Sequence, residues 1–229
     1  EVTRGKSPEL FTIVDDLRQK LGAPPFHHVL ATDEFNAGVV QAPRAGIFGW
    51  PRNYLLIGLP LMKSVTVEQF RAVLAHEFGH LAKSHGRMSN WIYRQRLRWS
   101  RLVDALDASE SQGGFLFKPF FNWYSPYFSA YSFPLARANE YEADATSVRL
   151  TSKMAAAEAL TSVNVVGAYL NERYWPEVHK HADDTPRPGF APFSGRGHHV
   201  ATNIDEASTQ TWIDRALAQK TTSADTHPA

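Results

Sequence analysis

Apolar residues recur every three or four positions in several stretches of the chain, a spacing typical of helices with one buried face. The helices predicted from this spacing span residues 7–21, 66–86, 88–106, 135–150, 153–170 and 205–218. The second of them begins with a capping box, because Thr66 and Gln69 are three residues apart ahead of Phe70. The third carries arginines beside its apolar stripe, so we expect a basic amphipathic helix there.

Three short runs rich in apolar or β-branched residues precede the helix at 66–86. They lie at residues 27–32, 37–41 and 54–59. Clusters of Asn, Gly and Pro separate these runs, which is typical of short strands joined by turns. We therefore predict an α+β fold that is mostly helical, with a small N-terminal sheet, antiparallel or mixed, and with the helix at 66–86 at its centre.

Composition excludes several classes of protein and of site. The chain has 229 residues, 43% of them hydrophobic, which is enough for a domain with a buried core. Lys and Arg number 24 against 23 Asp and Glu, and this balance gives no indication of a nucleic-acid partner. Because the chain has no cysteine, only histidines and carboxylates can be expected to bind a metal. Nothing in the pattern indicates an oligomeric state.

Residues 115–133 contain ten aromatic side chains, interrupted by prolines and polar residues. This segment is too polar and too broken to span a bilayer, which requires about 20 apolar residues. Two interpretations are open for the basic and aromatic region 87–133 as a whole. It rests on a membrane surface, where cations and aromatic rings gather, or it packs within the protein or at a dimer interface.

The sequence His76-Glu77-Phe78-Gly79-His80 lies inside the predicted central helix. At about 100° per residue, His76 and His80 are about 40° apart around the helix axis, so both imidazoles can reach one tetrahedral ion. Glu77 lies at the edge of that face, where its carboxylate can contact a water rather than the ion. A chance motif and a structural metal site are the alternatives, but structural zinc sites usually add a further Cys or His, which favours catalysis.

A site with two histidines needs a third ligand, and residues 137–144 offer carboxylates on a predicted helix. Glu140 and Asp144 share one face because they are four residues apart, whereas Glu142 points nearly opposite. We therefore predict Glu140 as the third ligand of one zinc ion. Asp144 suits a supporting role, in which it accepts the free N–H of a ligating imidazole. Arg137 lies near Asp144 or forms an ordinary surface ion pair with Glu140 or Glu142.

The motif HEFGH, followed about sixty residues later by RANEYEAD, resembles the zinc metalloproteases that include the HtpX heat-shock protease and the CAAX prenyl protease. Their signature is HExxH plus ExxxD, the gluzincin pattern. The resemblance extends from Asn36-Ala37, which is similar to an Asn-Ala pair beside the cleft in that family, to about Leu150. It also includes Thr226-His227-Pro228, which is similar to the start of a family segment that continues to an Arg near the active site.

This resemblance implies a zincin-like fold and a role for each matching residue. The implied roles are zinc binding for His76, His80 and Glu140, general base and acid for Glu77, and support of the site for Asp144. One metallopeptidase domain is then expected over 1–229. Its parts are an N-terminal helix and sheet (1–65), the active-site helix (66–86), the basic and aromatic region (87–134), a helical part with the third ligand (135–219) and a truncated polar tail (220–229).

We accordingly expect a zinc-dependent endopeptidase that acts on protein or peptide substrates, with an extended substrate pairing against the strand near residues 36–41. The resemblance further implies membrane association, with the catalytic domain on the cytoplasmic face and an anchor outside this chain, and a role in protein quality control. A zinc-binding interaction scaffold without activity is the main alternative. A metal hydrolase that does not cleave proteins is a third.

Overall fold

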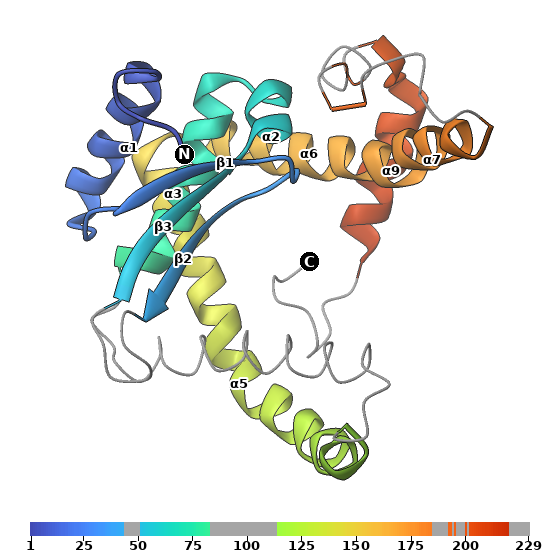
Figure 1. The fold of residues 1–229 in the computed structure, drawn as a ribbon. Helices are drawn as coiled ribbons and strands as arrows, with labels where there is room; N and C mark the ends of the chain where they lie inside the picture. The colour runs from blue at the N-terminus through green and yellow to red at the C-terminus, as the bar shows by residue number, and fades with distance from the viewer. Residues whose placement is uncertain are drawn as a thin grey trace. The chain divides into compact units, whose positions relative to one another are not determined.

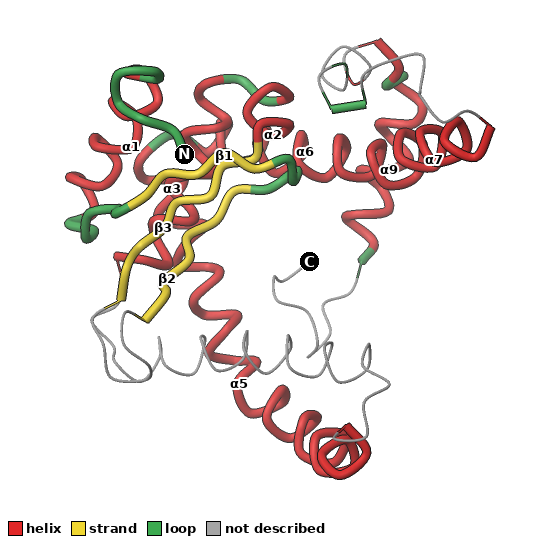
Figure 2. The backbone as a smooth tube through the Cα atoms, viewed as in Figure 1, coloured by secondary structure: helices red, strands yellow, loops and turns green. Residues whose placement is uncertain are grey.

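The structure is a computed structural model, and its ribbon and tube are drawn in Figures 1 and 2. It describes residues 1–43, 51–82, 114–184, 192, 193, 195, 200 and 202–219. The predicted basic helix at 88–106 lies outside the described residues. The chain divides into two compact units, Glu1–Ala82 with Ala143–Gln219, and Lys83–Glu142 with Lys220–Ala229. The expectation of one metallopeptidase domain over the whole chain stays a prediction.

The first unit contains a three-stranded mixed sheet (Figure 2). Its strands are β1 (His28–Thr32), β2 (Ala37–Pro43) and β3 (Pro51–Gly58), in the order β1-β3-β2. The central strand β3 pairs parallel with β1 and antiparallel with β2. This arrangement confirms the small N-terminal sheet and selects the mixed form from the two that were predicted. It also makes β2 an edge strand of the sheet.

Helices account for most of the remaining described residues of this unit. They are α1 (Pro8–Leu21), α2 (Leu59–Ser64), α3 (Val67–Ala82), α6 (Lys153–Tyr169), the π-helical turn η1 (Leu170–Tyr174), α7 (Trp175–Asp184) and α9 (Glu206–Ala218). The predicted capping box is present at the start of α3, where Gln69 N–H donates to Thr66 Oγ1 and Thr66 N–H donates to Gln69 Oε1. The sequence pattern missed α2, a single short helix directly after β3.

One face of the sheet packs against α1 and α3 to form the main core, and α3 lies behind the sheet in Figure 1. The buried apolar residues of this core are Val14, Leu17, Val29, Ala37, Leu55, Ile57, Leu61, Phe70, Leu74, Ala75 and Phe78. A second cluster joins α6, η1 and α9 around Tyr169, Tyr174 and Trp212. Because α3 contributes a whole buried face to the main core, the opposite face of this helix is held at a fixed position.

The turn between β1 and β2 is fixed by a close backbone approach at Gly58. The Gly58 N–H donates to the carbonyl oxygen of Asn36 at 2.7 Å. A Cβ atom at position 58 would lie 2.0 Å from the carbonyl oxygen of Glu34 and 2.5 Å from that of Asn36, so only glycine fits. The strand β2 therefore starts at a defined point beside the end of β3.

The helix α5 (Gly114–Leu150) is much longer than the predicted helix at 135–150. It includes Pro119, Pro126 and Pro134, each of which removes a helical hydrogen bond. Aromatic rings one turn apart contact each other along this part of the helix: Phe120 and Tyr124 stack with centroids 5.6 Å apart, and the next such contact joins Tyr124 to Phe128 at 6.1 Å. No helix in the described part of the chain is both long and apolar enough to cross a membrane.

Candidate metal centre

Two histidines project from one face of α3, one turn apart. His76 and His80 are both half-buried, and their rings meet edge to face with centroids 4.9 Å apart. Their Nε2 atoms are 3.2 Å apart. Between them in sequence, Phe78 is buried in the main core on the opposite side of the helix, which turns both imidazoles out of that core. The helical spacing predicted this pair of side chains, and the structure brings them together.

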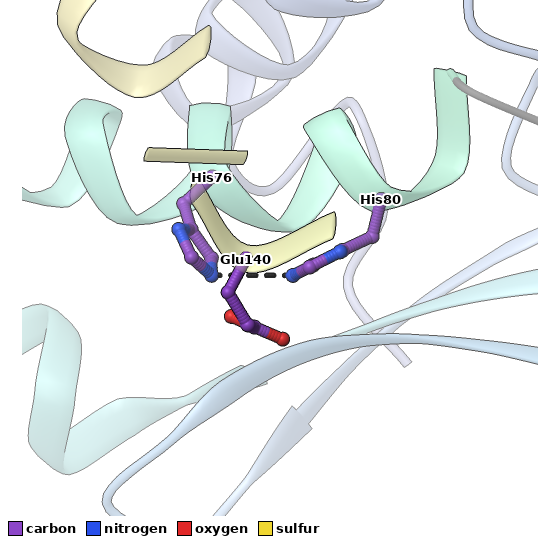
Figure 3. Close-up of side chains that lie close together, drawn as sticks. All are labelled: His76, His80 and Glu140. Atoms are coloured by element: carbon purple, nitrogen blue, oxygen red, sulfur yellow. Dashed lines mark hydrogen bonds between the residues drawn. The ribbon is translucent and has the colours of Figure 1, made fainter. Parts of the chain in front are cut away.

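Glu140 of α5 joins the two histidines (Figure 3). One atom each of His76, His80 and Glu140 can serve as a metal ligand, and these atoms all lie within 4.8 Å of one another. The Glu140 side chain is only 1% exposed, and in Figure 3 its carboxylate lies beside the gap between the two imidazoles. A buried carboxylate requires a compensating charge, which a bound cation would supply. The three residues predicted as ligands therefore form one cluster.

Asp144 lies one turn after Glu140 on α5 and contacts the first histidine. The Nδ1 atom of His76 is 2.9 Å from Asp144 Oδ1. Because a carboxylate only accepts, Nδ1 carries the proton and Nε2 presents its lone pair to the cluster. The sequence predicted this contact of Asp144 with a histidine. The role of Asp144 in supporting a metal ligand stays a prediction.

The donor set fits a zinc ion. Zinc prefers imidazole nitrogens and carboxylate oxygens in tetrahedral geometry, with Zn–N distances of about 2.0–2.1 Å. Two nitrogens bound in that way would be about 3.3 Å apart, and the Nε2 atoms of His76 and His80 are 3.2 Å apart. Two histidines with one carboxylate is also the ligand set of zinc hydrolases that keep a fourth position for a reactant.

Glu77 lies outside the ligand cluster, between α3 and the edge strand. Its Oε2 atom is 4.0 Å from the position that a Cβ atom would occupy at Gly38 of β2. The carboxylate of Glu77 therefore lies within van der Waals distance of position 38 on β2. The sequence pattern gave no indication of Gly38, because the contact joins two elements far apart along the chain.

Arg137 was predicted to lie near Asp144 or to form a surface ion pair. In the structure its Nε–H donates to the hydroxyl of Tyr141 at 2.7 Å, and its guanidinium lies 5.3 Å from the centre of the same ring. This contact is a pair one turn apart on α5. Nothing in the sequence pattern indicated Tyr141 as the partner of Arg137.

Other histidines in the described part of the chain have structural contacts. His27 Nδ1 accepts a hydrogen bond from the backbone N–H of Asn53 at 3.0 Å. The ring of His28 stacks on Tyr54, and that of His179 stacks on Trp175. Each of these three rings therefore contacts a neighbouring residue of the fold. His85, His198, His199 and His227 lie outside the described residues.

Comparison with known proteins identifies the family. The model of the family described as peptidase family M48 matches residues 6–229, nearly the whole chain. Comparison with curated proteins and with solved structures gave no significant match. The family match agrees with the cluster of two histidines and one glutamate, and it indicates a metallopeptidase. The chain therefore belongs to peptidase family M48, the family of the HtpX and CAAX prenyl zinc metalloproteases.

Proposed function

We propose that this chain is a zinc-dependent endopeptidase with a zincin-like active site. The observation that carries the proposal is the cluster of His76, His80 and Glu140, together with Glu77 beside it on α3. In this proposal the three ligands hold one zinc ion and Asp144 orients His76. A zinc ion bound there supplies Lewis-acid chemistry, lowering the pKa of water and polarising the carbonyl of the scissile bond.

Glu77 moves the protons of the reaction. Its carboxylate takes a proton from the attacking water as the oxygen of that water bonds to the carbonyl carbon. It then gives this proton to the amide nitrogen, the C–N bond breaks, and the products are a carboxylic acid, which keeps the second proton of the water, and an amine. The position of Glu77 supports this role, because its carboxylate adjoins the edge strand where an extended peptide would lie.

The substrate in this proposal is an extended peptide that pairs with β2. The bond from Gly58 N–H to Asn36 O makes these residues a hydrogen-bonded pair directly before the first pair of the β2–β3 ladder, Ala37 with Ile57. Such pairs alternate in antiparallel strands, so the backbone groups of Val39 and Gln41 point away from β3 toward the edge of the sheet. The Ala37 N–H also points outward but already donates to Asn36 Oδ1 at 2.8 Å. A bound peptide would therefore form its backbone hydrogen bonds with Val39 and Gln41.

We also propose that the aromatic part of α5 contacts a membrane surface. Residues 119–136 contain no charged side chain. Trp123 is 63% exposed and Tyr131 is 88% exposed, and Tyr127 is exposed as well. Trp and Tyr gather at the headgroup region because one end of each ring is apolar and the other is polar. The arginines at 87–101 would add attraction to anionic lipids.

The alternative of a silent zinc-binding scaffold is not favoured, because the family is one of peptidases. The scaffold predicts that a change at Glu77 has no measurable effect, because a scaffold needs the three metal ligands but no residue that carries a proton. A metal hydrolase that does not cleave proteins is separated by its substrates, because the wild-type protein would then show chelator-sensitive activity on small esters or amides and none on casein.

Replacing Asp144 with alanine should weaken zinc binding by about 10- to 100-fold, because the tautomer and orientation of His76 lose their support. Competition with a chromophoric chelator measures this affinity, and wild-type protein should bind one zinc per chain. Chelation of that zinc should also lower the melting temperature. The exposed Asp214 on α9 provides a matched control, and Asp214→Ala should bind zinc as wild type does. Equal affinity in all three proteins would rule out the role of Asp144.

Glu77→Gln should lower the rate of casein cleavage by about a hundredfold or more while the protein keeps its zinc, because the amide cannot carry the proton. Cleavage assays beside metal analysis measure both properties. Glu68→Gln, an exposed position in the first turn of the same helix, is the control and should keep full activity. A Glu77→Gln protein that cleaves casein at the wild-type rate would remove the proposed mechanism, and a zinc-bound wild type with no activity would favour the scaffold.

Val39→Pro should raise KM for an unfolded protein substrate with a smaller effect on kcat. Proline removes the outward N–H at position 39 but no bond of the ladder to β3. Steady-state kinetics on a fluorogenic peptide provide the measurement. Val39→Ala keeps this N–H and should leave KM near the wild-type value. If both variants change KM equally, the side chain rather than the backbone of β2 is responsible.

The double variant Trp123→Ala and Tyr127→Ala should reduce binding to vesicles of phosphatidylcholine with an anionic lipid at low salt, because it removes two exposed rings. Co-sedimentation measures the bound fraction. Met154→Ala, an exposed apolar residue on α6, is the control and should bind as wild type does. A wild-type chain that stays in the supernatant contradicts the membrane proposal.

A further inference from the structure

Small side chains line the surface along which α3 and the last turns of α5 meet, a region we name the α3–α5 seam. On α3 its buried residues are Ala72 and Gly79, and on α5 they are Ala143, Thr146 and Ser147. The spacing of seven residues on α3, and of three and four residues on α5, places each set on one helix face. All of these residues belong to the first compact unit. The two helix backbones can therefore approach each other closely.

The closest approach is at Gly79, the fourth residue of the HEFGH motif. A Cβ atom at this position would lie 3.1 Å from Ala143 Cα, 3.3 Å from Thr146 Cβ and 3.5 Å from Ala143 Cβ. The nearest of these atoms belongs to the backbone of α5, so no rotation of a side chain can relieve the contact. Any residue larger than glycine would push the two helices apart by a few tenths of an ångström.

A buried hydrogen bond fixes the seam at a second point. Ser147 Oγ–H donates to the carbonyl oxygen of Ala72 at 2.7 Å. Ala72 lies about two turns before Gly79 on α3, and Ser147 lies one turn after Ala143 on α5, so the helices run antiparallel along the seam. Beyond the Gly79 contact the next turn of α5 carries Glu140.

Gly79 is otherwise an unfavourable choice for this helix. Glycine in a helix interior costs about 1 kcal/mol relative to alanine. The position is fully inside α3, between two turns that carry the histidines. The close approach to Ala143 explains why a residue that weakens the helix occupies this position.

We propose that Gly79 is a positioning residue for the metal ligands. This inference rests on the proposed zinc site. The contact of Gly79 with Ala143 sets how near α5 comes to α3, and hence where Glu140 and Asp144 lie relative to the two imidazoles. Ligand sets work only when they are held within about 0.5 Å of the productive geometry. The displacement that an added methyl group imposes at Gly79 is of that size.

The test is Gly79→Ala in the full chain, with zinc affinity measured by chelator competition and the melting temperature of the metal-free protein measured beside it. We expect zinc affinity to fall about tenfold or more. The visible absorption of the cobalt-substituted protein should also change, because it reports the geometry of the ligands. Gly167→Ala on α6 is the matched control, since a Cβ there meets only Phe35 Cε1 at 4.0 Å. It should bind zinc and cobalt as wild type does.

Ala143→Val tests the same contact from the side of α5, in case Gly79→Ala does not fold. It adds two methyl groups at a buried position facing Gly79 and should also weaken zinc binding. Wild-type affinity and an unchanged cobalt spectrum in either folded variant would overturn the inference, even with a lowered melting temperature, because the contact would then serve stability alone. A wild-type chain that binds no zinc would overturn the proposed function itself.

Discussion

The packing of α3 against the end of α5 is the constraint on which the candidate site depends. The imidazoles of His76 and His80 come from one helix, and the carboxylates of Glu140 and Asp144 come from the other. Neither helix alone offers three ligands. The core beneath the sheet fixes α3, and the bond from Ser147 to Ala72 fixes the end of α5 against it. The geometry of the site is therefore set by packing between residues that take no part in the proposed reaction.

Much of this site could be predicted from sequence because its parts repeat at helical spacing. His76 and His80 are four residues apart, as are Glu140 and Asp144, and a helix places such pairs on one face whatever surrounds it. The capping box at Thr66 is also a local signal. The absence of cysteine then left few residues able to bind a metal. The three short strands were predicted from their composition and the turn residues between them.

The rest depends on contacts that sequence spacing does not encode. The prolines at 119, 126 and 134 favoured a late start for α5, whereas stacking of Phe120, Tyr124 and Phe128 accompanies a helix through them. Parallel pairing of β1 with β3 was not predictable because it is a tertiary property of the strands. The neighbours of Gly38 and Gly79 lie on other elements, so these glycines carried no signal of their position.

The hydrogen bond from Ala37 N–H to the Asn36 side chain also bears on aggregation of the protein. An edge strand with unpaired N–H and C=O groups is a template for any extended chain, including another copy of the same protein. The amide of Asn36 occupies the N–H of Ala37 at the start of β2, which shortens the run of backbone that a foreign strand could join. A shorter stretch of available backbone disfavours the long ladders from which aggregates grow.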